Sequence, residues 1–399
     1  MRRFALPLTV LLALSCATAP AVTPAVAPSP VSRVHGNAAG GRMQVPVSVN
    51  GQPAGPFILD TGAASSPLAA EYAKAIGIEG HSGGHAVGAG GAVDVAVATG
   101  ISYRIGDVEI RPHGAALIPL IPISLRAARR VNGVMGRDVF DRYVTEFDYA
   151  NEEVAFYRPD SYQPPAGAVV VPFEVVHNLP HIAARITLDD GRTLPVKLMV
   201  DSGAGNAVIL KKSFIEKNQI DLSHLTAVPE GLGVGGAVEQ RAGRLTRLEF
   251  AGLQFEKPVT MFSLATAGFF GDASSDGLIG GEVLSRFKFI VDYPRKRFYL
   301  VPTEHVNDPF EADMSGVHLL VRDASFTAVD VMSVLPGSPA AEAGLKAGDE
   351  LRTFNGQPVK PADLPTIRKE MREEGKSVTL TIVRNGVEQE VKFVTRRLI

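Results

Sequence analysis

The sequence lacks tryptophan and has a single cysteine, Cys16, among its 399 residues. One cysteine cannot form an intrachain disulfide, a cysteine-based zinc site or a Cys-x-x-Cys redox centre. An excess of charge of one sign is missing too, because 40 basic residues stand against 42 acidic ones. This balance disfavours nucleic acid as a partner, since nucleic-acid-binding surfaces are basic. The chain is too long for one ordinary core, so we expect two or three domains.

A long hydrophobic run is also missing from the N-terminus. The apolar stretch from Phe4 to Ser15 is too short to span a membrane but has the length of a signal-peptide core. It ends at Cys16 in a context that resembles a bacterial lipobox. We therefore predict a signal peptide over 1–16, a lipid anchor on Cys16 and a periplasmic location. The alternatives are soluble export after Ala17-Thr18-Ala19 and a retained anchor. Residues 17–42, rich in Ala, Pro and Val, predict a disordered tether.

An internal repeat organises the middle of the chain. In each copy an alternating strand meets an Asn-Gly or Asp-Gly turn, and an apolar strand then runs into Asp-Thr/Ser-Gly-Ala. The copies begin at Val45 and Ala184, and both continue with Gly-x-Gly-Gly-Ala-Val, at 88–93 and 233–238. Two β lobes of one design are therefore predicted, over residues 43–160 and 169–302. A linker and a third unit, over 313–399, are predicted to follow.

Two acidic triplets occupy matching places in the two copies, Asp60-Thr61-Gly62 and Asp201-Ser202-Gly203. One such triplet alone would be an ordinary strand-to-turn corner. Two carboxyl groups held together cannot both ionise cheaply, so they share one proton and titrate as a pair. The ionised group can activate water while the protonated one hydrogen-bonds a substrate carbonyl. The pattern therefore predicts that Asp60 and Asp201 form one acid-base pair, with no metal or other cofactor.

Over residues 43–302 the chain resembles the pepsin/retropepsin clan of aspartic proteases. The resemblance implies an all-β fold in which two pseudo-symmetric retropepsin-like lobes form one bilobal protease. It also implies that Thr61 and Ser202 bond across the lobe interface, and that Gly62 and Gly203 let the backbone approach closely. Glycine-rich flaps would close on the substrate and exclude water. Their glycines would be Gly88, Gly90, Gly91, Gly233, Gly235 and Gly236.

The sequence departs from this family at two places. Gly136-Arg137-Asp138 matches the motif of retroviral-type lobes, but the second copy has Gly280-Gly281-Glu282, so the lobes need not contribute equally. Ala63 and Ala204 stand where pepsin-type loops often carry a hydroxyl that stabilises the ionised carboxylate. Without that hydrogen bond the pKa values of the pair rise, which predicts activity nearer neutral pH.

Competing motifs are weaker. Residues 231–236 could pass for a dinucleotide loop, but no βαβ pattern surrounds them. His81 and His85, like His177 and His181, are four residues apart. These histidines lie near Gly or Pro, and not on a helix, so we expect solvated loop residues and no metal site. The chain also lacks the Gly-x-Ser-x-Gly motif that carries the nucleophilic serine of α/β-hydrolases.

The third unit resembles a PDZ domain of the bacterial protease-associated type. The resemblance rests on Pro336–Leu351, which reads PGSPAAEAGLKAGDEL, and on the Asn355-Gly356 turn after it. It implies a β-rich domain with short helices that receives a peptide C-terminus by strand addition. The receiving residues would be Gly316, Val317, His318 and Leu319. The alternative is a docking domain that binds its own protease lobes.

Together these patterns predict an exported aspartic endopeptidase that acts on polypeptide substrates and uses its third unit to recruit substrates or partners. The rival from another class is a peptide-binding scaffold of the cell envelope whose lobes no longer cleave. Both acidic residues and both adjacent hydroxyls are present, which argues against that rival.

Overall fold

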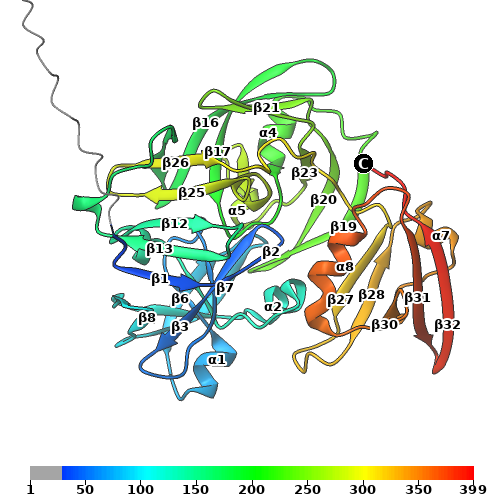
Figure 1. Ribbon diagram of the computed structural model, residues 1–399, viewed down its shortest axis with the longest axis horizontal. Coiled ribbons are helices and arrows are strands. Elements are labelled where there is room, and N and C mark those ends of the chain that lie inside the picture. The colour runs from blue at the N-terminus through cyan, green and yellow to red at the C-terminus, as the bar shows by residue number, and fades with distance from the viewer. Residues whose placement is uncertain (1–28) are drawn as a thin grey trace, which may run out of the picture.

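The computed structural model describes residues 29–399, except for the side chains of 229–232 and 237. Cys16 and the predicted signal peptide over 1–16 lie outside the described residues. The described part of the chain is mostly β strand and forms two 10-stranded and two 6-stranded sheets, so the all-β prediction is confirmed. In Figure 1, lobe 2 (green to yellow) lies above lobe 1 (blue to cyan), and the C-terminal domain (orange to red) lies beside them.

Lobe 1 runs from the first described strand to β13. Its elements are β1 (Ser32–His35), β2 (Asn37–Ala39), β3 (Arg42–Val49), β4 (Gly55–Leu59), β5 (Leu68–Ala69), α1 (Ala70–Ala75), β6 (His81–Val87), β7 (Ala92–Ala98), β8 (Tyr103–Ile105), β9 (Val108–Ile110), β10 (Ala115–Ile118), α2 (Ile121–Ala127), β11 (Gly133–Met135), α3 (Arg137–Phe140), β12 (Val144–Asp148) and β13 (Glu153–Tyr157).

A short 3-10 turn, η1 (Pro159–Ser161), leads to lobe 2. The elements of lobe 2 are β14 (Val169–Pro172), β15 (Glu174–Val176), β16 (Leu179–Thr187), β17 (Thr193–Asp201), β18 (Val208–Leu210), α4 (Lys212–Lys217), β19 (Thr226–Gly233), β20 (Gly236–Arg244), β21 (Arg247–Phe250), β22 (Leu253–Glu256), β23 (Val259–Ser263), α5 (Gly268–Gly271), β24 (Gly277–Gly280), α6 (Gly281–Leu284), β25 (Phe287–Asp292) and β26 (Arg297–Pro302).

The two lobes repeat one topology strand for strand. In lobe 1, nine strands of the 10-stranded sheet follow the order β6-β7-β10-β5-β11-β4-β3-β8-β9, and the tenth, β2, pairs with β3. In lobe 2 the order is β19-β20-β23-β18-β24-β17-β16-β21-β22, and the tenth strand, β15, pairs with β16. Each lobe 2 strand stands thirteen places after its lobe 1 counterpart. The alternating sequence of β3 buries Met43, Val45, Val47 and Val49 in the core, as a half-buried strand requires. The repeat seen in the sequence is therefore a repeat of the fold.

A 6-stranded sheet joins the lobes, with the order β1-β13-β12-β25-β26-β14. The junction is the antiparallel pair of β12 and β25, in which Thr145 lies opposite Val291. Because β1 pairs with β13 and β2 with β3, the predicted disordered tether is wrong for residues 32–42. Its Gly and Ala suggested low complexity, but Val34 is buried and Gly40-Gly41 forms a turn with φ of 58° and 76°.

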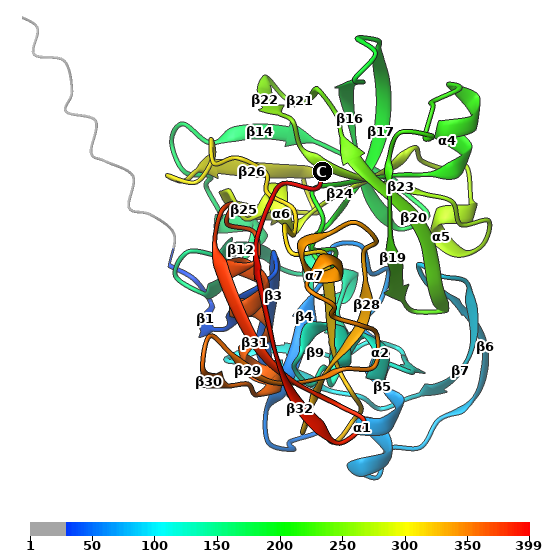
Figure 2. The same cartoon turned by 90° about the vertical axis from the view of Figure 1, so that its right-hand side faces the viewer.

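The C-terminal domain has a separate apolar core and a sheet ordered β27-β28-β29-β31-β32, which faces the viewer in Figure 2. Its elements are β27 (Val317–Val321), β28 (Val329–Val334), α7 (Pro339–Glu342), β29 (Glu350–Phe354), β30 (Gln357–Pro358), η2 (Pro361–Asp363), α8 (Leu364–Glu370), β31 (Ser377–Arg384) and β32 (Val387–Val394). Its edge strand β27 and helix α8 face the protease lobes.

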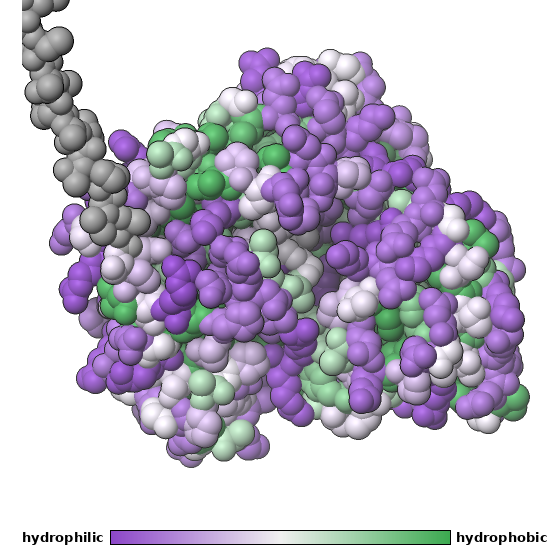
Figure 3. All heavy atoms as spheres, in the orientation of Figure 1, coloured by the Kyte–Doolittle hydropathy of each residue, from purple (hydrophilic) through white to green (hydrophobic). Residues whose placement is uncertain are grey.

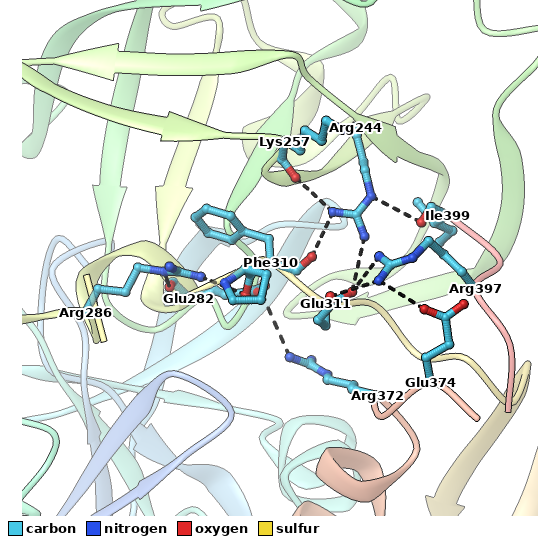
Figure 4. Close-up of polar contacts among 11 residues, drawn as sticks. Arg244, Lys257, Glu282, Arg286, Phe310, Glu311, Arg372, Glu374, Arg397 and Ile399 are labelled. Carbon is cyan, nitrogen blue, oxygen red and sulfur yellow. Dashed lines mark hydrogen bonds and ion pairs between the residues drawn. The ribbon is translucent and has the colours of Figure 1, made fainter. Parts of the chain in front are cut away.

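The segment between lobe 2 and the C-terminal domain is packed and not a free linker (Figure 4). Phe310 is buried in the core of the lobes, under the guanidinium of Arg286 at 3.7 Å from its ring centroid. Arg244 donates a hydrogen bond to the carbonyl of Phe310 (2.7 Å), and Glu311 pairs with Arg397 of the C-terminal domain (2.7 Å). These contacts fix the domain against lobe 2.

Candidate active site

The structure brings Asp60 and Asp201 together at the lobe interface. Asp60 directly follows β4 and Asp201 is the last residue of β17, and both strands lie near the middle of their sheets. A Cβ atom on Gly62 would lie 2.7 Å from the carboxyl carbon of Asp201, and one on Gly203 would lie 2.4 Å from that of Asp60. Each glycine therefore leaves the space that the opposite carboxyl group occupies.

Thr61 and Ser202 lock the two loops to each other, as the resemblance implied. The amide of Thr61 donates to Ser202 Oγ and the amide of Ser202 donates to Thr61 Oγ1, both at 3.0 Å. Each hydroxyl then donates across the interface, Thr61 to the carbonyl of Val200 (2.7 Å) and Ser202 to that of Leu59 (3.0 Å). Both side chains are fully buried. Four hydrogen bonds thus fix the spacing of the two acidic residues.

Burial raises the pKa of both carboxyl groups, and the two are not equivalent. The pKa of Asp60 is raised well above its ordinary value by burial, by the charge of Asp201 and by their mutual hydrogen bond. The pKa of Asp201 is raised by burial, but the hydrogen bond from Asp60 and the amides of Ala204 and Gly203 oppose that rise. Both amides donate to Asp201 Oδ1 at 2.9 Å. Burial and the proximity of the two charges therefore favour a single proton held on the pair.

The glycine-rich hairpins of the two lobes meet at their tips. The first hairpin is β6–β7 and the second is β19–β20. The amide of Gly90 donates to the carbonyl of Val234 at 2.9 Å, and a Cβ on Gly90 would lie 2.5 Å from the carbonyl oxygen of Gly236. The six predicted flap glycines, Gly88, Gly90, Gly91, Gly233, Gly235 and Gly236, all lie in or beside these two tips. Side chains at the contact would hold the hairpins apart.

Arg42 is a site residue that the sequence did not single out. Its Nε donates to the carbonyl of Gly203 at 2.7 Å, next to one of the two acidic residues. Burial and the charge of Arg126 lower the pKa of Arg42 to about 10, while Asp201 opposes that change. The Arg42 charge in turn favours the ionised form of Asp201. Arg42 lies in the stretch predicted as tether, and only the cross-lobe pairing brings it to the site.

The departure of lobe 2 from the Gly-Arg-Asp motif has a structural reason. A Cβ on Gly281 would lie 1.9 Å from the carbonyl oxygen of Gly41, so no side chain fits there. Glu282, which follows, lies 3.9 Å from Arg372 of the C-terminal domain. In lobe 1 the matching Arg137 pairs with Asp141 at 3.0 Å, within its own helix turn. Lobe 2 has adapted this corner to the contacts of a neighbouring strand and domain.

The four residues predicted to receive a peptide, Gly316, Val317, His318 and Leu319, lie on β27 and the loop before it. Three of their backbone groups, given next, have partners within the protein. The amide of Gly316 donates to Asp313 Oδ1 (2.7 Å) and that of Val317 to Ser315 Oγ (3.1 Å). The carbonyl of Leu319 accepts from Arg368 (2.8 Å). Burial and the charges of Arg368 and Arg126 lower the pKa of His318 to about 4.

The expectation of solvated loop residues is wrong for His181, which is buried on β16, while His81 and His85 are exposed but lie on strand β6. His85 pairs with Asp94, and His181 shares a hydrogen bond of 3.0 Å with the carbonyl of Leu179. Over residues 29–399, no group of three or more His, Cys, Asp or Glu side chains is arranged to hold a metal ion.

Among the helices of residues 29–399, none is long and apolar enough to cross a membrane.

Comparison with protein families identifies both parts of the chain. The aspartyl protease model matches residues 45–139 and 184–283, which contain Asp60 and Asp201 at corresponding places. A PDZ domain model matches residues 331–384. Both segments that contain the acidic loops thus match the aspartyl protease family, and the C-terminal unit matches a PDZ domain. The recognition of a two-lobed, retropepsin-like protease with a C-terminal PDZ domain is thereby confirmed.

Other relatives of this aspartyl protease-like chain cover less of it. A "Probable CtpA-like serine protease" of Staphylococcus aureus (strain bovine RF122 / ET3-1) is 24% identical over 162 residues, which is 40% of this chain and 32% of that protein. The chain thus spans about a third of the length of the curated relatives it matches. An aspartic proteinase from Irpex lacteus has a TM-score of 0.43 at 12% identity and covers 69% of this chain and 98% of its own. A retropepsin-like aspartic protease from Rickettsia conorii has a TM-score of 0.26 at 23% identity, with coverages of 35% and 92%.

Proposed function

We propose that this protein is an aspartic endopeptidase in which Asp60 and Asp201 hydrolyse peptide bonds. One observation carries the proposal. The two partly buried carboxyl groups hydrogen-bond each other at the lobe interface, and the reciprocal bonds of Thr61 and Ser202 hold them there. Two carboxyl groups that share a proton supply a base and an acid in one site. A scaffold protein would not need two carboxyl groups held against each other, where their raised pKa values cost stability at neutral pH.

The proposed reaction starts from ionised Asp201 and protonated Asp60. Asp201 takes a proton from a water molecule as the water oxygen attacks the substrate carbonyl carbon. Asp60 gives its proton to the carbonyl oxygen, and a neutral tetrahedral diol forms. The C–N bond then breaks as Asp201 returns its proton to the leaving nitrogen and Asp60 recovers a proton from the diol. The amine and carboxylic acid products leave the pair in its starting state.

An extended polypeptide is the substrate class that the flaps suit. Strands β6 and β19 are the edge strands of their sheets. Edge strands offer free main-chain groups, so an extended segment can pair with them while its side chains fill neighbouring pockets. Recognition of the main chain on both sides of the scissile bond favours internal cleavage. The PDZ domain is proposed to recruit substrates or partner proteins.

The function is tested with unfolded casein and the protein over residues 29–399. We expect internal fragments, identified by mass spectrometry, and complete inhibition by a statine-type compound, whose hydroxyl mimics the tetrahedral diol. A fluorophosphonate that labels reactive serines should have no effect. Absence of cleavage between pH 3 and 7.5 would favour the scaffold function, and inhibition by the fluorophosphonate alone would favour a serine protease.

We also propose that the protein is exported and anchored by a lipid on Cys16. The support is the short basic start and apolar run that precede this cysteine. Replacing Cys16 by serine in the full chain should move the protein from the membrane fraction to the soluble fraction of the cell envelope. An unchanged distribution in that fractionation would exclude the lipid anchor and leave soluble export or a retained apolar anchor.

A further inference from the structure

The C-terminal end of α2 in lobe 1, here called the α2 end and comprising Leu125–Ala128, lies against the PDZ domain. Ala128 is only 3% exposed and belongs to the apolar core of the PDZ domain, and Leu125 packs on the same core. Helix α2 contacts strand β27, and Figure 1 shows it beside α8 and β27. The molecular surface is hollowed where the lobes and the PDZ domain meet (Figure 3). A segment of the protease thus covers the edge of the PDZ domain.

Hydrogen bonds fix the α2 end between α8 and β27. The guanidinium of Arg368, on α8, donates to the carbonyl of Arg126 at 2.7 Å and to the carbonyl of Leu319 at 2.8 Å. The second bond therefore occupies the carbonyl of Leu319 on the edge strand β27. A peptide added to this edge would use main-chain groups of the same strand. Just beyond the α2 end, Arg130 lies over the ring of Phe326 at 5.1 Å. The α2 end therefore occupies the groove that a bound peptide would take.

The opposite side of α2 supports the flaps. Ile123 and Ala127 pack in an apolar cluster with Val93 and Val95 of the lobe 1 flap. The same cluster includes Val234 at the tip of the lobe 2 flap. Helix α2 also contacts β19, a strand of that flap. One short helix thus touches the PDZ groove on one side and both flaps on the other.

Its counterpart in lobe 2, α5, is held differently. Phe269 of α5 donates its amide to the carbonyl of Gly88 in the lobe 1 flap (3.0 Å). The buried ammonium of Lys211 lies 3.7 Å from the Phe269 ring centroid and 3.1 Å from Asp272. Lys211 precedes α4, and the residue that precedes the equivalent helix α1 is Ala69. Side chains of lobe 2 itself therefore hold α5 in place, whereas the PDZ groove holds α2 of lobe 1.

We propose that the α2 end is an internal ligand of the PDZ groove, and that a peptide with an apolar C-terminal segment and a free carboxylate competes with it. The groove side chains that now bury Leu125 and Ala128 would receive the apolar residues, and the guanidinium of Arg368 would provide positive charge for the carboxylate. Displacement of the α2 end removes support from the lobe 2 flap, so the flaps open more readily and turnover rises. This regulation rests on the proposed protease function.

The first test measures binding only, so it is independent of catalysis. The probe is a fluorescent peptide with the sequence of residues 121–128, Ile-Pro-Ile-Ser-Leu-Arg-Ala-Ala, and a free carboxylate. The fluorescence anisotropy of the peptide is measured with two proteins that span residues 29–399. One carries Asp60→Asn alone, and the other carries Asp60→Asn together with Leu125→Glu. Because an occupied groove lowers apparent affinity, we expect Leu125→Glu to tighten binding at least tenfold. The amidated peptide should bind more weakly. Equal binding to both proteins would overturn the internal-ligand proposal.

The second test measures hydrolysis of an amidated, internally quenched peptide. The free-carboxylate probe should raise the turnover of the wild type at least threefold and saturably, and Leu125→Glu should raise basal turnover and abolish the response. Ala128→Glu provides a second variant if Leu125→Glu unfolds. Lys392→Gln, on the far edge strand β32, is the matched control and should behave as the wild type. Tighter binding without any change in turnover would overturn the coupling to the flaps, while loss of hydrolysis in every protein would refute the protease function and leave the binding result standing.

Discussion

Replacing either Asp60 or Asp201 by asparagine is expected to lower kcat/KM for a peptide substrate by about 10²–10⁴-fold, and to leave the fold intact. Asparagine keeps the size and the hydrogen-bonding shape of the side chain. It cannot take a proton from water, as Asp201 must, nor give one to the carbonyl oxygen, as Asp60 must. The measurement is steady-state hydrolysis of a quenched peptide by each variant, and a variant that keeps near wild-type turnover would contradict the shared-proton mechanism.

Thermal unfolding provides the control for that experiment. The direction in which the free energy of unfolding changes with pH follows from the pKa of Asp60. Since the pKa of Asp60 is raised in the folded state, mainly by burial, the folded protein binds more protons than the unfolded chain above the ordinary carboxyl pKa. The free energy of unfolding therefore falls as pH rises from the ordinary carboxyl pKa to the raised pKa of folded Asp60. Asp60→Asn removes this contribution. It should unfold at the same or a higher temperature than the wild type at pH 7, with a weaker dependence on pH.

Removing the hydroxyl groups that lock the two loops should have the largest effect on stability. Thr61→Val leaves the amide of Ser202 and the carbonyl of Val200 without the partners they have now. Each buried polar group left unpaired costs about 1–3 kcal/mol, so we expect a loss of about 2–6 kcal/mol in the free energy of unfolding. Activity should fall as well, because the spacing of the two carboxyl groups depends on the same bonds.

Denaturant unfolding measures this loss, and Thr260→Val provides a matched control. Thr260 is also fully buried, and its hydroxyl donates to the carbonyl of Pro258, which accepts a second bond from the amide of Leu245. Its replacement should cost less than that of Thr61. Ser202→Ala should resemble Thr61→Val, and the double variant should lose less than the sum, since the bonds are reciprocal. If Thr61→Val were no more destabilising than Thr260→Val, the hydrogen bonds across the interface would not hold the lobes.

The internal repeat made much of the fold predictable. The alternating strands, the Asn-Gly turn at Asn50 and the Asp-Thr/Ser-Gly triplets are local patterns, and a second copy of each removed the ambiguity of the first. The pairing of Asp60 with Asp201 followed from that duplication, and the bonds of Thr61 and Ser202 across the interface followed from the family resemblance. Residues 32–42 were missed because strands β1 and β2 contain short, Ala- and Gly-containing stretches whose partners lie far away in the sequence.

The contacts between parts could not be predicted from local patterns. Arg42 reaches Gly203 only because the two lobes pair, and nothing near it in the sequence indicates that contact. The packing of Phe310 on lobe 2 and of Ala128 in the PDZ core likewise depends on surfaces that are distant in the chain. The PDZ resemblance predicted residues 316–319, on β27 and the loop before it, as the peptide-receiving segment, but the contact between α2 and β27 became visible only in the three-dimensional arrangement.

The pH dependence of kcat/KM on one quenched peptide tests the central claim most directly, because it counts the protons in the active form. A pair that shares one proton predicts a bell-shaped profile. The acidic limb reports ionisation of Asp201, which the Arg42 charge favours, and the alkaline limb reports loss of the proton held by Asp60 at a pH well above the ordinary carboxyl range. A kcat/KM profile that rises with pH, reaches a plateau above pH 7 and does not fall at higher pH would indicate a base other than the carboxyl pair. That result would contradict the mechanism.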